Sequence, residues 1–231
     1  MSSLQIGSLV LAFLGPLALW AAHRRNPHPR LERNAALAIA ALLLVVYVGE
    51  VAVKVIDDGF DPTLVLPMQL CDWARFAVMA ALLRRSQTCF ELGYFWGLCG
   101  TLQAIVTPAI AHDEHWLKQL GFFLDHAGIV AGVFFLLLVA RMRPHGLGRV
   151  LVWSEIYLAA ALTVNALLGA NYGFLSHKPD NPSLLDLFST THWIYVLEIN
   201  AIALVFFAIA YAPWWLVQRR ASSCQPSARR A

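Results

Sequence analysis

The chain has 231 residues, of which 59% are hydrophobic and 13% charged, with a mean hydropathy of +0.61 and a formal net charge of +3. Soluble domains carry about 25% charged residues, so this composition excludes an ordinary soluble domain and predicts a polytopic membrane protein. The arginines gather in short connections between apolar segments, which is a pattern of membrane topology, and we therefore expect no nucleic-acid partner.

Seven apolar segments are long enough to cross the hydrocarbon core as helices, which takes about 20 residues each. In chain order they cover residues 4–22, 35–56, 64–83, 88–108, 117–140, 149–169 and 190–217. The first segment has its arginines after it, which favours a retained anchor over a cleaved signal peptide. The sequence predicts an all-α membrane protein, with one bundle of seven transmembrane helices over residues 1–218 and a basic, disordered cytoplasmic tail over residues 219–231.

The charges of the connections predict the orientation of the bundle. Arginines follow the first, third, fifth and seventh segments, whereas the connections after the second and fourth carry acidic residues. Basic connections stay in the cytoplasm, so we expect the N-terminus outside and the C-terminus inside a cell membrane. The charges alternate in this way only if segment 64–83 crosses, although it contains Cys71, Asp72 and Arg75.

Polar residues of the predicted helices fall at one depth. With a rise of about 1.5 Å per residue, six segments place polar groups in the outer half of the membrane, while the inner half is nearly apolar. Buried charges in a membrane usually face the bundle interior or a water-filled cavity, so we expect a polar cavity that opens outward. Its predicted residues are Glu50, Cys71, Asp72, Arg75, Gln103, His126, Asn165 and Glu198.

Cys71 and His126 are the candidate catalytic pair in this layer. A cysteine beside a histidine base is the arrangement for acyl transfer through a thioester. Arg75 shares a helix face with Cys71 at i,i+4, and a nearby guanidinium favours a thiolate. Asp72 is placed to pair with Arg75 at i,i+3.

The remaining polar residues are candidates for a supporting shell. Glu198 or Glu50 could orient the imidazole of His126, whereas Asp125 is adjacent in sequence to His126 and is expected to point elsewhere. Side-chain amides could donate hydrogen bonds to an oxyanion, and the candidates are Gln69, Gln103, Asn165 and Asn171. The cysteine and histidine spacings resemble no zinc site, so we expect no metal and no cofactor.

Other functions fit the same residues. A transporter or channel for protons or a small solute would use Glu50, Asp72, Arg75 and Glu198, with Cys71 as packing, although no internal repeat is visible. A non-catalytic lipid-binding scaffold would use these residues for stability alone. Two small-residue patterns, Gly93 to Gly97 and Gly128 to Gly132, permit a close pairing of the fourth and fifth segments without requiring it. The oligomeric state stays open.

Several motifs between about residues 64 and 198 resemble a known family. LPMQLCDWARF, FELGYFWGLCGTLQAIVTP, FFLDHAG, NALLGANYGFL and SLLDL are similar, in this order, to the YwaF-type bacterial integral membrane family, a relative of mammalian transmembrane protein 164. The latter is regarded as a cysteine-dependent acyltransferase that remodels ether phospholipids. The resemblance implies a membrane lipid as substrate, Cys71 as nucleophile and His126 as its partner. The chain carries Gln69 where that family usually has histidine.

Overall fold

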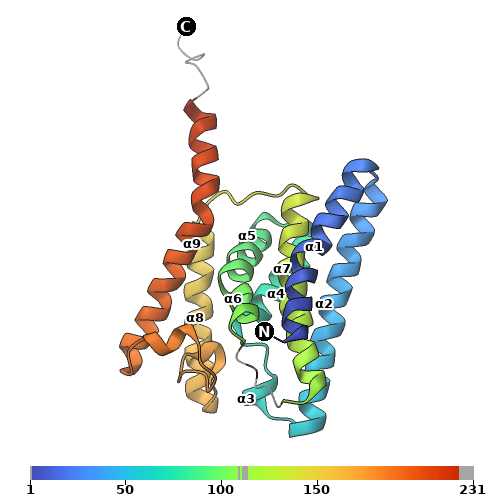
Figure 1. Cartoon of the computed structure of the whole chain (residues 1–231). Helices are drawn as coiled ribbons and strands as arrows, with labels where there is room; N and C mark the ends of the chain where they lie inside the picture. Colours follow the sequence, from blue (N-terminus) through green and yellow to red (C-terminus); the bar gives the residue numbers. More distant parts are fainter. Residues whose placement is uncertain (1, 109, 111–113, 224–231) are drawn as a thin grey trace.

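The computed structural model describes residues 2–108, 110 and 114–223, and the regular structure of these residues is entirely helical (Figure 1). The elements are α1 (Ser3–Arg25), α2 (Pro29–Asp58), α3 (Pro62–Val65), α4 (Leu70–Arg84), α5 (Gln87–Trp96), a π-helical turn (Gly97–Thr101, the π turn), α6 (Leu102–Val106), α7 (Trp116–Leu138), α8 (Gly148–Leu168), two 3-10 turns (Tyr172–Phe174 and Leu184–Leu187) and α9 (His192–Ser223). The prediction of an all-α fold is confirmed. Residues 219–223 of the predicted tail continue α9, and residues 224–231 lie outside the described part.

Five of the described helices are long and apolar enough to cross a membrane, namely α1, α2, α7, α8 and α9. They give the chain a multi-pass membrane character. In Figure 1, α1, α7 and α9 run upward and α2 and α8 run downward, so that the beginning of α1 and the end of α9 lie toward opposite ends of the molecule.

The third and fourth predicted segments are interrupted, for local reasons. Segment 64–83 contains an extended stretch before α4, because Pro67 disfavours helix at Leu66, and α4 itself begins only at Leu70. Segment 88–108 is interrupted by the π turn, a rare i→i+5 geometry that is frequent at functional sites. The interruptions place non-α backbone beside the predicted polar layer.

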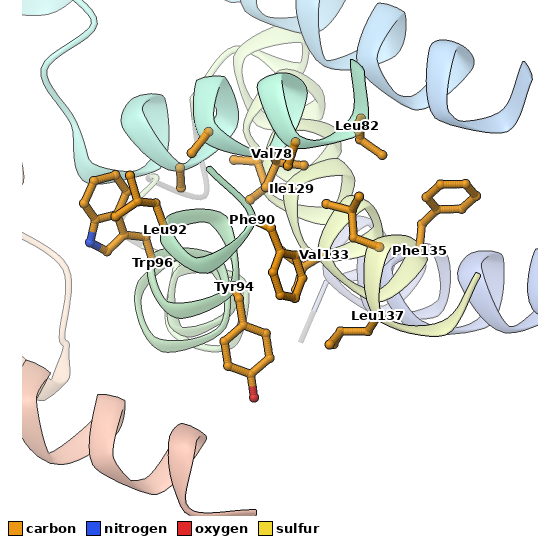
Figure 2. Close-up of a cluster of buried hydrophobic side chains, with 14 of the residues drawn as sticks. Val78, Leu82, Phe90, Leu92, Tyr94, Trp96, Ile129, Val133, Phe135 and Leu137 are labelled. Carbon is orange, nitrogen blue, oxygen red and sulfur yellow. The ribbon is translucent and has the colours of Figure 1, made fainter. Parts of the chain in front are cut away.

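Helix α7 is the central element, packed against α1, α2 and α4. Val78 of α4 lies between two glycines, since a Cβ at Gly93 of α5 or at Gly132 of α7 would come within 2.6 or 2.5 Å of its methyl groups. Gly97 faces α7 and Gly128 faces α2. The glycines of the two small-residue patterns therefore do not face each other, and each makes room for a side chain from a neighbouring helix. One of these side chains, Val78, belongs to the buried hydrophobic cluster shown in Figure 2.

Hydrogen bonds tie α9 to the rest of the molecule at several points along its length. Near its start, the Tyr195 hydroxyl donates to the carbonyl of Phe174 at 2.8 Å. Nearer its end, the Tyr94 hydroxyl donates to the carbonyl of Ala210 at 2.9 Å and accepts from Nε1 of Trp214 at 2.9 Å. These bonds fix the stretch of α9 between them relative to α5 and to residues 169–191, which join α8 to α9 (the outer connection, named for the side on which the sequence predicts it).

Candidate functional site

Cys71 lies in the first turn of α4, which the local sequence caps tightly. The N–H of Gln69 donates to Oδ2 of Asp72 at 2.9 Å, and the side-chain Oε1 of Gln69 accepts from the N–H of Gly173 at 2.9 Å. The first turn of an α-helix leaves backbone N–H groups without intrahelical partners and carries a partial positive charge. The extended stretch and this cap therefore present Cys71 at the end of a helix that favours an anion.

A cavity of about 450 Å³ opens beside this turn. That volume lies within the range of small-molecule sites, about 300–1,000 Å³. Six α-helices, the π turn and the outer connection contribute to its lining. Of the predicted residues, the structure brings the following together in this lining: Glu50, Gln69, Cys71, Asp72, Arg75, Gln103 and His126.

Arg75 is the electrostatic centre of the cavity. Its guanidinium is 2% exposed and binds Asp125 side-on, with Nε to Oδ1 at 2.5 Å and Nη2 to Oδ2 at 2.7 Å. Nη1 donates to Oδ1 of Asp72 at 2.8 Å, as the i,i+3 spacing predicts. Nη2 also lies 3.4 Å from Oε2 of Glu50, and the ring of Tyr47 covers the guanidinium at 4.7 Å. One cation thus holds three carboxylates that come from three helices.

The expectation that Asp125 points away from the cavity is wrong. Asp125 is fully buried and lines the cavity with His126, because α7 is surrounded by other helices and two neighbouring positions both face partners. Its Oδ2 lies 3.9 Å from Nδ1 of His126. Tyr47 was also missed, although it shares a helix face with Glu50 at i,i+3, a signal that the sequence contains.

His126 is buried and its orientation is fixed. Nδ1 lies 2.7 Å from the carbonyl of Phe122, which accepts only, so the proton resides on Nδ1 and the lone pair on Nε2. A ring nitrogen of His126, the sulfur of Cys71 and a carboxylate oxygen of Asp125 all lie within 4.8 Å of one another. Thiol, imidazole and carboxylate therefore share one small space.

This triplet also has the donor types of a zinc site, which the sequence spacing did not suggest. Both oxygens of Asp125, however, already accept hydrogen bonds from Arg75. A guanidinium in direct contact with a ligand carboxylate repels a second cation. The residues present do not fit a metal ion while this ion pair is intact.

Three predicted shell residues, all in the described part of the chain, lie outside the cavity lining: Asn165, Asn171 and Glu198. Asn165 is bonded to the backbone of Tyr172 at 2.8 and 3.0 Å. Asn171 caps the backbone of Ser176 and His177 at 3.0 and 3.1 Å, and Glu198 accepts from the N–H of Ser189 at 2.6 Å. In the structure, these amides and this carboxylate bind the backbone of the outer connection.

The outer connection is in turn fastened to both ends of α3. The Tyr172 hydroxyl donates to the carbonyl of Pro62 at 2.6 Å and accepts from the N–H of Leu66 at 3.1 Å. Burial raises the pKa of Tyr172, so this hydroxyl stays protonated at physiological pH. Gly173 has a φ of +66°, and a Cβ there would lie 2.6 Å from the hydroxyl of Tyr157. These contacts fix the position of the outer connection, which forms one wall of the cavity.

Comparison with known proteins matches residues 1–211 to the model of the TMEM164 family. The chain belongs to the TMEM164 family. It is also 32% identical over 154 residues to an uncharacterized protein of Treponema pallidum (strain Nichols), a match that covers 65% of this chain and 64% of that protein. The chain thus spans less than two thirds of the length of this relative. No solved structure matches the chain. The family assignment confirms the resemblance found in the sequence, and the TMEM164 model covers the whole of the cavity described above.

Proposed function

We propose that this member of the TMEM164 family is a membrane-embedded acyl-transfer enzyme that acts on lipid esters through Cys71 and His126. The observation that carries the proposal is the shared cavity, in which the thiol, an imidazole nitrogen and a carboxylate lie within 4.8 Å of one another. Catalytic pairs in unliganded sites are often longer than hydrogen-bond distance and tighten with substrate.

The proposed reaction proceeds in two balanced halves. Nε2 of His126 takes the proton of Cys71 as the sulfur attacks the ester carbonyl, and the same proton passes to the departing alcohol as the C–O bond breaks. The thioester is then attacked by an acceptor hydroxyl, whose proton goes to His126 and from there to the sulfur of Cys71 as the S–C bond breaks, which restores the thiol and the neutral imidazole. In this proposal, the N–H of Cys71 in the first turn of α4 donates to the oxyanion, and Asp125, 3.9 Å from His126, stabilises the imidazolium.

We also propose that all seven predicted segments cross, with the N-terminus outside and the C-terminus in the cytoplasm of a cell membrane. Helix α4 alone rises about 22 Å over its residues, and the extended stretch before it adds the remaining height toward a core of about 30 Å. Residues 87–106, from α5 through the π turn to α6, form a second crossing of nearly full length. The alternating connection charges support both assignments.

The decisive experiment is a search for the covalent intermediate. The full chain is reconstituted in vesicles with phospholipid that carries a labelled acyl chain, and hydroxylamine-sensitive label is mapped by mass spectrometry. We expect label on Cys71, loss of label in Cys71→Ala, and a rate lowered about 10²–10⁴-fold in His126→Gln. Cys99 is a matched control because it lines the same cavity, so Cys99→Ser should keep the label. Full acyl transfer by Cys71→Ala would overturn the proposal.

One observation favours a second candidate, a proton or small-cation pathway. Three carboxylates meet one guanidinium in the cavity, which leaves an excess of acidic groups at membrane depth. This function predicts pH- or voltage-dependent flux across liposomes that persists in Cys71→Ala and disappears in Glu50→Gln. Acyl transfer predicts no such flux, so the two functions are separated by one pair of variants.

A further inference from the structure

One face of α9 forms a wall of the cavity. Ile199, Ile202, Ala203 and Phe206 line it, and their spacing of three, four and seven residues places them on a single helix face. From the first to the last, this stripe (the α9 stripe) rises about 10 Å along the helix. All four side chains are neither buried nor fully exposed, so the face is accessible from the cavity.

The other walls near the α9 stripe are mainly apolar as well. Phe174, Leu184 and Leu185 of the outer connection line the cavity on one side, and Cys99 and Gly100 of the π turn line it on another. The carboxylates and the guanidinium of Arg75 come from α2, α4 and α7. The cavity therefore has a charged end formed by these three helices and an apolar side formed by α9, the π turn and the outer connection.

The position of the α9 stripe is fixed relative to the nucleophile. The hydrogen bonds of Tyr195 before it and of Ala210 after it hold α9 at both ends of this stretch. The opposite face of α9 carries exposed apolar side chains such as Leu197, Leu204 and Val205, as expected for a surface that meets lipid. The stripe thus differs from the rest of α9 in facing an internal cavity.

We propose that the α9 stripe and the π turn form a binding slot for one fatty acyl chain, with the ester carbonyl at Cys71 and the methyl end toward Phe206. A long apolar chain next to a compact polar ester matches the division of the cavity into an apolar side and a charged end. The placement of the carbonyl rests on the proposed function, whereas occupation of the slot by an acyl chain does not. Ala203, the smallest residue of the stripe, sets the width of the slot, and Phe206 sets its length.

Photolabelling tests the slot independently of catalysis. The full chain in detergent, in a Cys71→Ala background, is labelled with a long-chain fatty acid that carries a terminal diazirine, with and without excess oleic acid. We expect label on residues 199–206 that oleic acid competes away. Ala203→Trp should reduce this label about tenfold or more, because the indole fills the space of the acyl chain. Ala201→Trp is the control, because Ala201 is exposed on another face of α9 and should leave the label unchanged.

A second variant, Phe206→Ala, keeps the test valid if Ala203→Trp fails to fold. Phe206→Ala removes bulk and should shift the preferred competitor toward longer fatty acids, while the melting temperature shows that the fold is kept. Equal label in Ala203→Trp and Ala201→Trp, or label on residues 199–206 that oleic acid does not compete, would overturn the slot. Thioester on Cys71 without competed label at the stripe would overturn the slot alone, and competed label without thioester would overturn the proposed function alone.

Discussion

At the scale of single residues, the cavity depends on Arg75. Its guanidinium is buried, so the cost of removing this charge from water must be offset by its partners. The two short bonds to Asp125 and the bond to Asp72 supply that compensation, and Glu50 adds a weaker contact. The arrangement joins α2, α4 and α7 around the thiol and the imidazole.

We expect Arg75→Met to destabilise the protein by about 3–5 kcal/mol, because it leaves buried carboxylates without their counter-charge. The measurement is the free energy of unfolding in mild detergent. Arg85→Met is the matched control, because the Arg85–Glu32 bridge is partly exposed and such bridges contribute about 0–1 kcal/mol. Equal costs for the two substitutions would show that the Arg75 cluster is not a buried network.

The contact between Arg75 and Asp125 also distinguishes thiol chemistry from a metal centre. Because Arg75 occupies both oxygens of Asp125, we expect prolonged treatment with a strong chelator to leave acyl transfer and the melting temperature unchanged. Elemental analysis of the purified chain supplies the control. A stoichiometric metal whose removal abolishes activity would mean that Asp125 leaves Arg75 to bind it.

At the scale of elements, glycines decide how closely the helices approach. The sequence marks Gly93, Gly97, Gly128 and Gly132 as small-residue patterns, but the partners are side chains of other helices rather than the facing glycines. Gly121 of α7 works in the same way, since a Cβ there would lie 2.8 Å from Cγ of Glu50. The absence of a side chain at Gly121 leaves room for the Glu50 side chain to approach Arg75, so the close packing of α2 and α7 helps to form the charged end of the cavity.

Gly132→Ala should destabilise the fold by about 1–3 kcal/mol, because the new methyl group overlaps Val78 in a filled core. Gly49→Ala is the control: nothing lies within 4 Å of its Cβ position, and alanine in a helix interior gains up to about 1 kcal/mol over glycine. Thermal unfolding of both variants, and of Gly132→Ala combined with Val78→Ala, tests the contact. If the added Val78→Ala substitution recovers no stability, Val78 is not the clashing group.

At the scale of the whole molecule, the membrane topology depends on two interrupted segments. Five helices satisfy the length and hydropathy of a membrane span, while segment 64–83 is interrupted before α4 and segment 88–108 is interrupted between α5 and α6. The interruptions provide non-α backbone at the cavity, and such backbone within a membrane is tolerated only where protein or a water-filled cavity surrounds it. The polar cavity therefore gives the interrupted segments the surroundings that their non-α backbone needs.

Cysteine accessibility measures the crossing of α4 directly. In a background without the native cysteines, Asp58→Cys before α3 should react with an impermeant maleimide from outside intact cells. Arg84→Cys at the end of α4 should react only after the cells are permeabilised. Gly146→Cys, in the connection after α7, is the control for the cytoplasmic side. Labelling of Asp58→Cys and Arg84→Cys from the same side would show that α4 does not cross.

The sequence by itself determined the all-helical membrane character and the family, because hydropathy and motif order act along each segment separately. It did not determine which way each side chain points around its helix. Asn165 and Glu198 share the predicted depth and yet hold the outer connection, whereas Asp125, expected to point away, joins Arg75 and His126. Only the tertiary structure decided this, because the direction of a side chain depends on how neighbouring helices are rotated and packed, and those contacts lie between residues far apart in the chain.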